Sequence, residues 1–203
     1  MGQGECGKAL LVKVGYDCTI KSNGVSMRRS VVFLLLSLVL GAEGITVPAG
    51  FSATFVQKVT TPKKKTVRYK GNVQVNRDRR FRWVYTAPAS REICGDGKRV
   101  RIVDHPLEQV IVYRVGSLVD LMQLLKRAKP HHDRIYTAEY HGVNYTLKLD
   151  RQGHIEQVAY TDDLDNTVNI RFHNVRYLDT PIPETRLDCP VPAGYDVIRG
   201  KQR

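Results

Sequence analysis

The chain of 203 residues gives room for one domain, or for two small ones. Hydrophobic residues make up 42% of it and charged residues 26%, which excludes a mostly disordered protein. The formal net charge of +12 is compatible with nucleic acid, anionic lipid headgroups or an acidic protein as a partner. Because the basic residues are spread along the chain, apart from Lys63–Lys65 and Arg77–Arg80, we expect no nucleic-acid site.

The segment 27–44 has the pattern of an export signal. Two arginines precede the apolar run Val31–Leu40, and small residues follow, with Ala42 and Gly44 at the −3 and −1 positions of a cleavage site. A transmembrane helix is the alternative, but about 12 apolar residues span only ~18 Å as a helix, against ~30 Å of hydrocarbon. The pattern therefore predicts a signal peptide and an exported product.

The signal divides the chain into three parts. Residues 1–26 show no periodicity and are interpreted as an over-extended N-terminus, while residues 45–203 form the exported domain. Removal of the first two parts leaves two cysteines, Cys94 and Cys189, in an oxidising compartment. Two cysteines in an exported domain predict one disulfide, with two free thiols as the alternative.

In the exported part, apolar side chains recur at every second position between turn residues, which is typical of β-strands. Short connections rich in Gly and Asp separate the segments, so neighbouring strands are expected to be antiparallel. The segments with this pattern are Phe51–Val59, Val67–Val75, Phe81–Tyr85, Arg91–Cys94, Arg99–Asp104, Gln109–Val115, Ile135–His141, Val143–Leu149, Ile155–Thr161 and Thr167–Val175. The sequence predicts a single antiparallel sheet of about ten strands.

One segment has the pattern of a helix, with Ser117 as its N-cap and Pro130 at its end. Its apolar stripe consists of Leu118, Leu121, Met122, Leu124 and Leu125. A sheet of this size must curl or cover its apolar face, and this helix could cover a concave face. The result would be an apolar hollow for a small molecule or a lipid. Side chains that fill it as an ordinary core are the alternative, and the pattern leaves both open.

No cluster of side chains predicts catalysis, a cofactor or a metal ion. His131 and His132 stand before an aspartate in an expected loop, where they are solvated. The acidic run Asp162–Asp165 lacks the distal glutamate of a calcium loop and fits a hairpin turn. Gly95–Gly97 is too short for a phosphate-binding loop, and no serine has a nucleophile-elbow context. We therefore expect a protein that is not an enzyme.

Four stretches of the exported part resemble the motifs of the LolA family, the periplasmic carriers of outer-membrane lipoproteins. Each motif is weak by itself, whereas their order and spacing over nearly the whole exported part are specific. The stretches are Phe51–Val59 (FSATFVQKV), Arg77–Pro88 (RDRRFRWVYTAP), Asp96–Lys98 with Pro106–Gln109, and Pro192–Ile198 (PAGYDVI).

The resemblance implies an unclosed, half antiparallel β-barrel with a small helical lid over an apolar cavity for lipoprotein acyl chains. The side chains expected to line this cavity are Phe55, Phe81, Trp83, Leu121 and Leu125. Arg77 stands where the family has the arginine whose hydrogen bonds hold the lid closed. The six residues Ile45–Gly50 leave no room for the family's N-terminal lid helix, so we expect Leu118–Lys129 to provide most of the cover.

The resemblance also implies partners. A monomeric carrier would be loaded with acylated lipoproteins by an ABC-type release complex of the inner membrane. It would deliver them to an acceptor at the outer membrane, without a cofactor and without nucleic acid.

Two alternatives stay open. The first is a related half-barrel that binds another anionic lipid or a glycolipid, or that senses mislocalised lipoproteins. The second is a structural periplasmic domain with a filled core.

Overall fold

The computed structural model describes residues 45–114 and 120–200. The expected signal peptide, residues 1–26, and the expected helix residues Ser117 and Leu118 lie outside them. The strands are β1 (Gly50–Thr60), β2 (Thr66–Asn76), β3 (Arg80–Ala87), β4 (Arg91–Asp96), β5 (Arg99–Asp104), β6 (Gln109–Arg114), β7 (Lys129–His132), β8 (Ile135–Tyr140), β9 (Val143–Leu149), β10 (Ile155–Thr161), β11 (Thr167–Leu178) and β12 (Asp196–Arg199). The helices are α1 (Leu121–Arg127) and α2 (Glu184–Leu187). Neither of these helices is long and apolar enough to cross a membrane.

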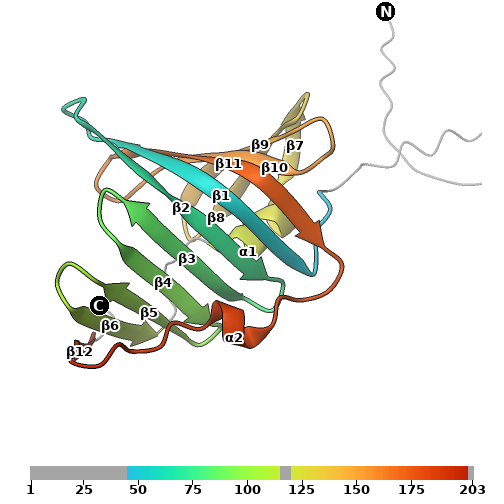
Figure 1. The fold of residues 1–203 in the computed structure, drawn as a ribbon. Helices are drawn as coiled ribbons and strands as arrows, with labels where there is room; N and C mark the ends of the chain where they lie inside the picture. The colour runs from blue at the N-terminus through green and yellow to red at the C-terminus, as the bar shows by residue number, and fades with distance from the viewer. Residues whose placement is uncertain (1–44, 115–119, 201–203) are drawn as a thin grey trace, which may run out of the picture. The chain divides into compact units, whose positions relative to one another are not determined.

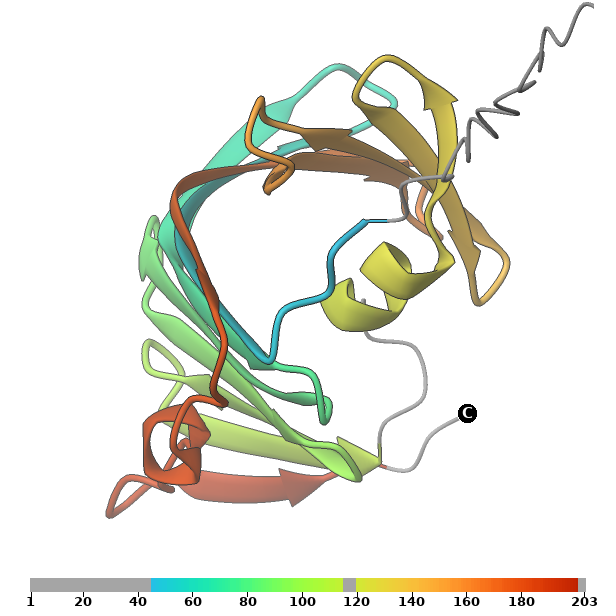
Figure 2. The ribbon, with the colours of Figure 1, turned by 90° about the vertical axis from the view of Figure 1, so that its right-hand side faces the viewer.

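The twelve strands form one sheet in the order β12-β6-β5-β4-β3-β2-β1-β11-β10-β9-β8-β7. Every neighbouring pair is antiparallel except β12 and β6, which run parallel. The sheet curls around α1, and the terminal strands β7 and β12 do not pair with each other (Figures 1 and 2). The expected unclosed antiparallel β-barrel with a small helical lid is confirmed.

The concave face of the sheet carries the main core. Alternate residues of β1 point into it, among them Phe51 and Phe55, which are almost completely buried. Residues of β11 complete this part of the core, because Phe55 is the register partner of Phe172. This pairing of β1 with β11 joins the two halves of the sheet, of which one contains β1 to β6 with β12 and the other β7 to β11.

The ten expected strands are all present, while β7 and β12 are additional. Each of these two has four residues, all exposed, so neither has the alternation that would reveal it. The expectation of a loop at His131 and His132 is wrong, since both residues belong to β7. The expected hairpin turn at Asp162 is confirmed, because its carboxylate accepts hydrogen bonds from the N–H groups of Leu164 and Asn166.

Helix α1 is shorter than the sequence suggests and begins at Leu121. Its N-cap is Asp120, whose carboxylate accepts a hydrogen bond of 3.1 Å from the N–H of Gln123. An aspartate satisfies the free donors of a first helical turn as well as serine does. Pro130 does not end the helix directly, because the chain turns at Ala128 into β7.

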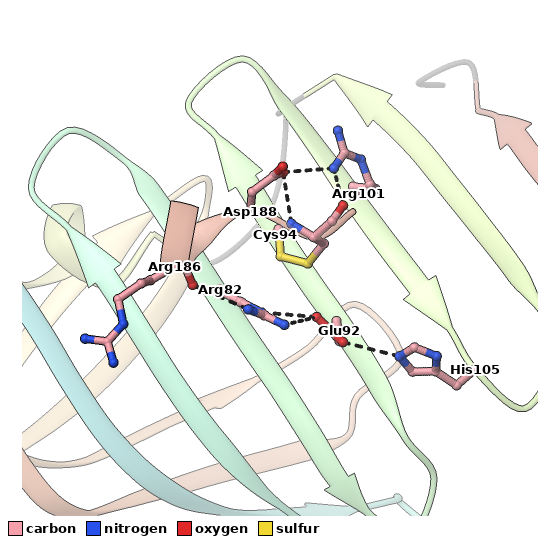
Figure 3. A network of polar contacts seen from close by, with 8 residues as sticks. Arg82, Glu92, Cys94, Arg101, His105, Arg186 and Asp188 are labelled. Carbon is pink, nitrogen blue, oxygen red and sulfur yellow. Dashed lines mark hydrogen bonds and ion pairs between the residues drawn. A yellow bond between two sulfur atoms is a disulfide. The ribbon is translucent and has the colours of Figure 1, made fainter. Parts of the chain in front are cut away.

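The C-terminal arm, residues 179–195, covers the outer face of β4, β5 and β6 and forms a second, small core. Cys94 and Cys189 are joined in a disulfide with a Cα–Cα distance of 5.9 Å, and Val103 and Val110 pack beside it. Figure 3 shows this disulfide among the polar contacts of the arm. Near the start of the arm, Ile182 is held by buried Asn76, whose side-chain amide donates one hydrogen bond to the Ile182 carbonyl and accepts one from its N–H, each of 2.8 Å.

Loss of the disulfide should destabilise the protein. The bond joins residues 95 positions apart, and a closed loop of that size is worth about 4 kcal/mol of unfolding free energy on the chain-entropy model. We expect this loss for the variant Cys94→Ser/Cys189→Ser, measured by urea unfolding of the exported protein. The wild type treated with reductant serves as the control and should match the variant. If the wild type were equally stable with and without reductant, the disulfide would not stabilise the protein as expected.

Candidate functional site: an apolar hollow under a short helix

An aromatic wall lines the concave face along β3. The strand's alternation places Phe81, Trp83 and Tyr85 on this face, where the ring of Phe55 meets Trp83 at 4.9 Å and Tyr85 at 5.1 Å between centroids. These edge-to-face contacts fix the rings in place. Gly95 of β4 makes room for Phe81, because a Cβ atom at this glycine would lie 2.2 Å from the ring.

The wall borders a small hollow of about 100 Å³ beneath α1. Its lining residues are Gln57, Phe81, Trp83, Tyr85, Ile93, Leu121, Val158, Tyr160, Ile170 and Phe172. A second hollow, of about 380 Å³, shares Gln57, Tyr85 and Ile93 with the first and continues to Arg91. The two hollows therefore adjoin, and the hydrogen bond of 3.0 Å from the Tyr85 hydroxyl to Gln57 lies at their junction.

The expected cavity residues occupy two positions relative to this hollow. Phe81, Trp83 and Leu121 line it directly. Phe55 and Leu125 do not line it but are buried in the main core, where the ring of Phe55 packs against Trp83 and Tyr85. A cavity role for all five therefore stays a prediction, with three of them already in contact with the open space.

Helix α1 packs four side chains into the main core, and one of them, Leu121, also lines the hollow. Leu121, Met122, Leu124 and Leu125 are all at most 3% exposed and belong to the main core. Seven residues are too few for a stable isolated helix, so α1 depends on this packing and on its cap.

An ion pair ties the start of α1 to the rim of the sheet. The guanidinium of Arg79, in the turn between β2 and β3, lies 3.1 Å from the carboxylate of Asp120. One oxygen of Asp120 accepts from Arg79 while the other caps the helix at Gln123. Asp120 is 11% exposed and Arg79 44%, so solvent weakens this pair.

Arg77 holds a different segment. Its guanidinium donates hydrogen bonds to the main-chain oxygens of Pro48, at 3.2 Å, and of Val47. The segment 45–49 runs on the concave side of the sheet (Figure 2), and Ile45 and Val47 pack against the main core. In this structure Arg77 therefore secures the segment that precedes β1, and the ion pair to α1 comes from Arg79. The lid-closing role of Arg77 stays a prediction.

On the outer face, three side chains of types that often bind metal ions lie close together, namely Glu92, Cys94 and Cys189. Both sulfur atoms are in the disulfide. The Glu92 carboxylate accepts hydrogen bonds from Arg82 and lies 3.3 Å from a ring nitrogen of His105 (Figure 3). The group is therefore a structural cluster that anchors the arm.

Comparisons with known proteins agree with this geometry. The family model for the outer membrane lipoprotein carrier protein LolA matches residues 48–139. The outer-membrane lipoprotein carrier protein of Campylobacter jejuni is 31% identical over 149 residues, which cover 73% of this chain and 86% of that protein. The carrier protein of Wolinella succinogenes is also 31% identical, with the same coverage.

The chain belongs to the LolA family.

A solved structure supports the fold independently. An uncharacterised conserved protein from Thermus thermophilus superposes with a TM-score of 0.50 at 12% identity, covering 76% of this chain and 92% of that one. At this identity the likeness concerns the fold alone.

Several lining residues of this LolA-family protein were accessible to sequence reasoning, and others were not. Gln57 and Tyr85 have the same parity as Phe55 and Phe81 in their strands, so the alternation already points them at the hollow. The lining residues of β10 and β11 needed the register of β11 with β1 and that of β10 with β11. Nothing in the sequence pairs Arg79 with Asp120, which are 41 positions apart.

The Arg79–Asp120 pair should stabilise the closed position of α1. Arg79→Ala and Asp120→Asn each remove the charge pair, and the asparagine still caps the helix, so each should cost about 0.5 kcal/mol of local opening energy. Asp120→Ala also removes the cap and should cost about 1 kcal/mol more. Hydrogen exchange at the Leu124 amide, which bonds to the Asp120 carbonyl, measures this opening. The control Arg134→Ala, which changes an exposed arginine elsewhere, should leave hydrogen exchange at Leu124 unchanged. Unchanged exchange in all variants would contradict a stabilising role of the Arg79–Asp120 ion pair.

Ionisation of Tyr85 should destabilise the fold at high pH. Burial raises the pKa of this hydroxyl to about 12, against the lowering effect of the Arg91 charge. In the unfolded chain the Tyr85 hydroxyl ionises near pH ~10. The stability that depends on neutral Tyr85 is therefore complete below pH ~10 and is lost between pH ~10 and ~12. Urea midpoints at pH 9 and pH 11 should fall less in Tyr85→Phe than in the wild type. An identical fall in both proteins would contradict this assignment.

Proposed function

We propose that this protein carries acylated lipoproteins through the periplasm and that its concave hollow receives their acyl chains. The observation that supports this most is the aromatic and aliphatic hollow beneath a short, separately attached helix. The names of the relatives in Campylobacter jejuni and Wolinella succinogenes, outer-membrane lipoprotein carrier proteins, describe the same task. In this proposal the protein binds and transfers its cargo and catalyses no reaction.

The energetics of the cargo explain why a carrier is needed. Each methylene group withdrawn from water gains ~0.8 kcal/mol, so a single acyl chain of ordinary length represents more than ~10 kcal/mol. Such a molecule does not cross an aqueous compartment unaided. A concave sheet with one apolar face offers the required shelter, provided that the cover can move aside.

The size of the hollow indicates that α1 has to move. A space of about 100 Å³ is smaller than the engineered cavity of ~150 Å³ that holds one benzene molecule. Acyl chains therefore fit only if the leucines of α1 leave the sheet and the adjoining hollow near Arg91 takes part. In our proposal, the position of α1 over the hollow is the closed arrangement of the carrier.

Attachment of the lid by polar contacts suits a carrier that must also give its cargo away. A ligand that binds only the open state has an apparent affinity that falls with the fraction of molecules in that state, and a more stable closed state makes this fraction smaller. In our proposal, the ion pair of Arg79 with Asp120 holds α1, and the hydrogen bonds of Arg77 hold the segment 45–49. Both contacts lower the net affinity, so that an acceptor at the outer membrane can withdraw lipoproteins received from an inner-membrane release complex.

The single tryptophan tests the proposal directly, since Trp83 lines the hollow. Bromine atoms quench indole fluorescence only at short range. A triacylated lipopeptide with brominated acyl chains should quench Trp83 when added to the exported protein without detergent, and its non-brominated form should not. Equal quenching by a brominated phospholipid or glycolipid would favour a general lipid carrier. Absence of quenching by any of them would refute the carrier function.

Two leucine variants supply the matched comparison. Leu121→Glu places a charge in the lining. It should weaken the affinity for the brominated lipopeptide, measured by the quenching titration, at least tenfold, because burial of an unpaired carboxylate is costly. Leu164→Glu makes the same change in an exposed turn, where the leucine is 76% exposed, and should leave binding unchanged. Far-ultraviolet circular dichroism of both variants verifies that the sheet is intact.

A further inference from the structure

The hairpin of β1 and β2 carries a surplus of positive charge at its outer end. From Ile45 to Arg77 the sequence contains seven basic residues and no acidic residue. Figure 1 shows the end of this hairpin projecting at the upper left. Six of the seven basic residues lie there and are exposed. We name them the basic hairpin, and they are Lys58, Lys63, Lys64, Lys65, Arg68 and Lys70.

The turn of the hairpin holds three of these lysines next to one another. The N–H of Lys64 donates to the carbonyl of Thr61, and the N–H of Thr61 donates to the carbonyl of Lys65, each at 2.8 Å. The N–H of Lys65 also donates to the Thr61 hydroxyl, at 3.2 Å. These hydrogen bonds fix the backbone of the turn, so three consecutive positive charges, which include Lys63, are kept together at one tip.

The register of the strands places further cations behind this turn. Lys58 of β1 lies directly opposite Arg68 of β2. Val56 of β1 stands between Lys70 of β2 and Arg171 of β11. These residues lie on the outer face, because the intervening residues of β1 and β11 belong to the core of the concave face. Like charges that face each other destabilise a strand pair, so the fold gains no stability from this arrangement.

The chain does not neutralise the basic hairpin. In residues 45–114 and 120–200, none of its six cations lies within ion-pair distance of a carboxylate. The neighbouring turn, between β10 and β11, contains Asp162, Asp163 and Asp165. The Asp162 carboxylate is engaged by the N–H groups and the side chain of its own turn. Three acids therefore stand beside six cations, and the surplus charge is left for a partner outside the chain.

From this surface we infer that the basic hairpin docks the protein on an anionic lipid bilayer. Clusters of about four to eight Lys and Arg residues bind anionic bilayers electrostatically. Five of the six cations are lysines, whose compact charges on flexible stems can each reach a mobile phosphate headgroup. A protein interface is instead depleted of lysine and enriched in arginine and aromatic residues. A second copy of this chain is a poor partner, because its net charge of +12 has the same sign.

The larger hollow of the concave face belongs to the same hairpin. Val59 of β1 and Tyr69 of β2 line it, each next in sequence to a cation of the basic hairpin. This hollow adjoins the small one beneath α1 through their shared lining residues Gln57, Tyr85 and Ile93. Docking by the hairpin would therefore bring the larger hollow close to the bilayer. Transfer of an acyl chain there rests on the proposed function, whereas the bilayer contact itself does not.

Cosedimentation of the exported protein with lipid vesicles tests this inference. The protein should bind vesicles of phosphatidylcholine with about 30 mol% phosphatidylglycerol, more weakly as salt rises, and should not bind pure phosphatidylcholine. Lys63→Gln/Lys64→Gln/Lys65→Gln should lower the partition coefficient about tenfold or more. Lys63→Arg/Lys64→Arg/Lys65→Arg conserves the charge and should keep the wild-type coefficient.

The control is Lys98→Gln/Arg134→Gln/Arg151→Gln, which removes three charges from other exposed turns and should change binding less than twofold. An equal loss in the control and in the hairpin variant would show a general effect of net charge and overturn the inference. Absence of binding to the phosphatidylglycerol vesicles would also overturn it, and hairpin-dependent binding of polyglutamate would then indicate an acidic protein partner. Quenching of Trp83 by the brominated lipopeptide should be the same in all variants, which separates this inference from the proposed function.

Discussion

An open sheet of twelve strands has to hide one apolar face without closing on itself. The pairing of β1 with β11 is central to it, because it joins β1 to β6 with β12 on one side and β7 to β11 on the other into one sheet with a shared concave side. The aromatic side chains of β1, β3 and β11 fill much of that side, and α1 covers what remains. The small hollow and the helix beside it both follow from this need to bury the concave face.

The arrangement of the strands was accessible to sequence reasoning because one physical signal repeats along the chain. The alternation at Phe51 and Phe55 in β1 and at Phe81 and Trp83 in β3 identifies both the strands and the faces that they bury. The short turns define antiparallel neighbours, and the Asp162 turn behaves as expected. Strands whose residues are exposed on both faces, such as β12, give no such signal and become visible only through their pairing with β6.

The candidate site was accessible only in part. Phe81, Trp83 and Leu121, expected to line a lipid cavity, line the small hollow, since their own strand or helix pattern decides which way they point. The role of the hollow as a lipid cavity stays a prediction. The ion pair of Arg79 with Asp120 depends on how a turn of the sheet meets the start of α1, and local pattern does not encode that meeting.

Asp120 serves two structures with one carboxylate, since it caps α1 and also holds Arg79. A helix of seven residues has little stability apart from its cap and the surface beneath it. Once lifted from the sheet, α1 would fray unless another apolar surface took the place of the old one. In the proposed carrier, the stable arrangements are therefore the closed one and the loaded one, because an open and empty hollow would leave α1 without an apolar surface to pack on. The unloaded carrier of this proposal would return to the arrangement in which the four apolar side chains of α1 are buried, so that the concave face does not promote aggregation.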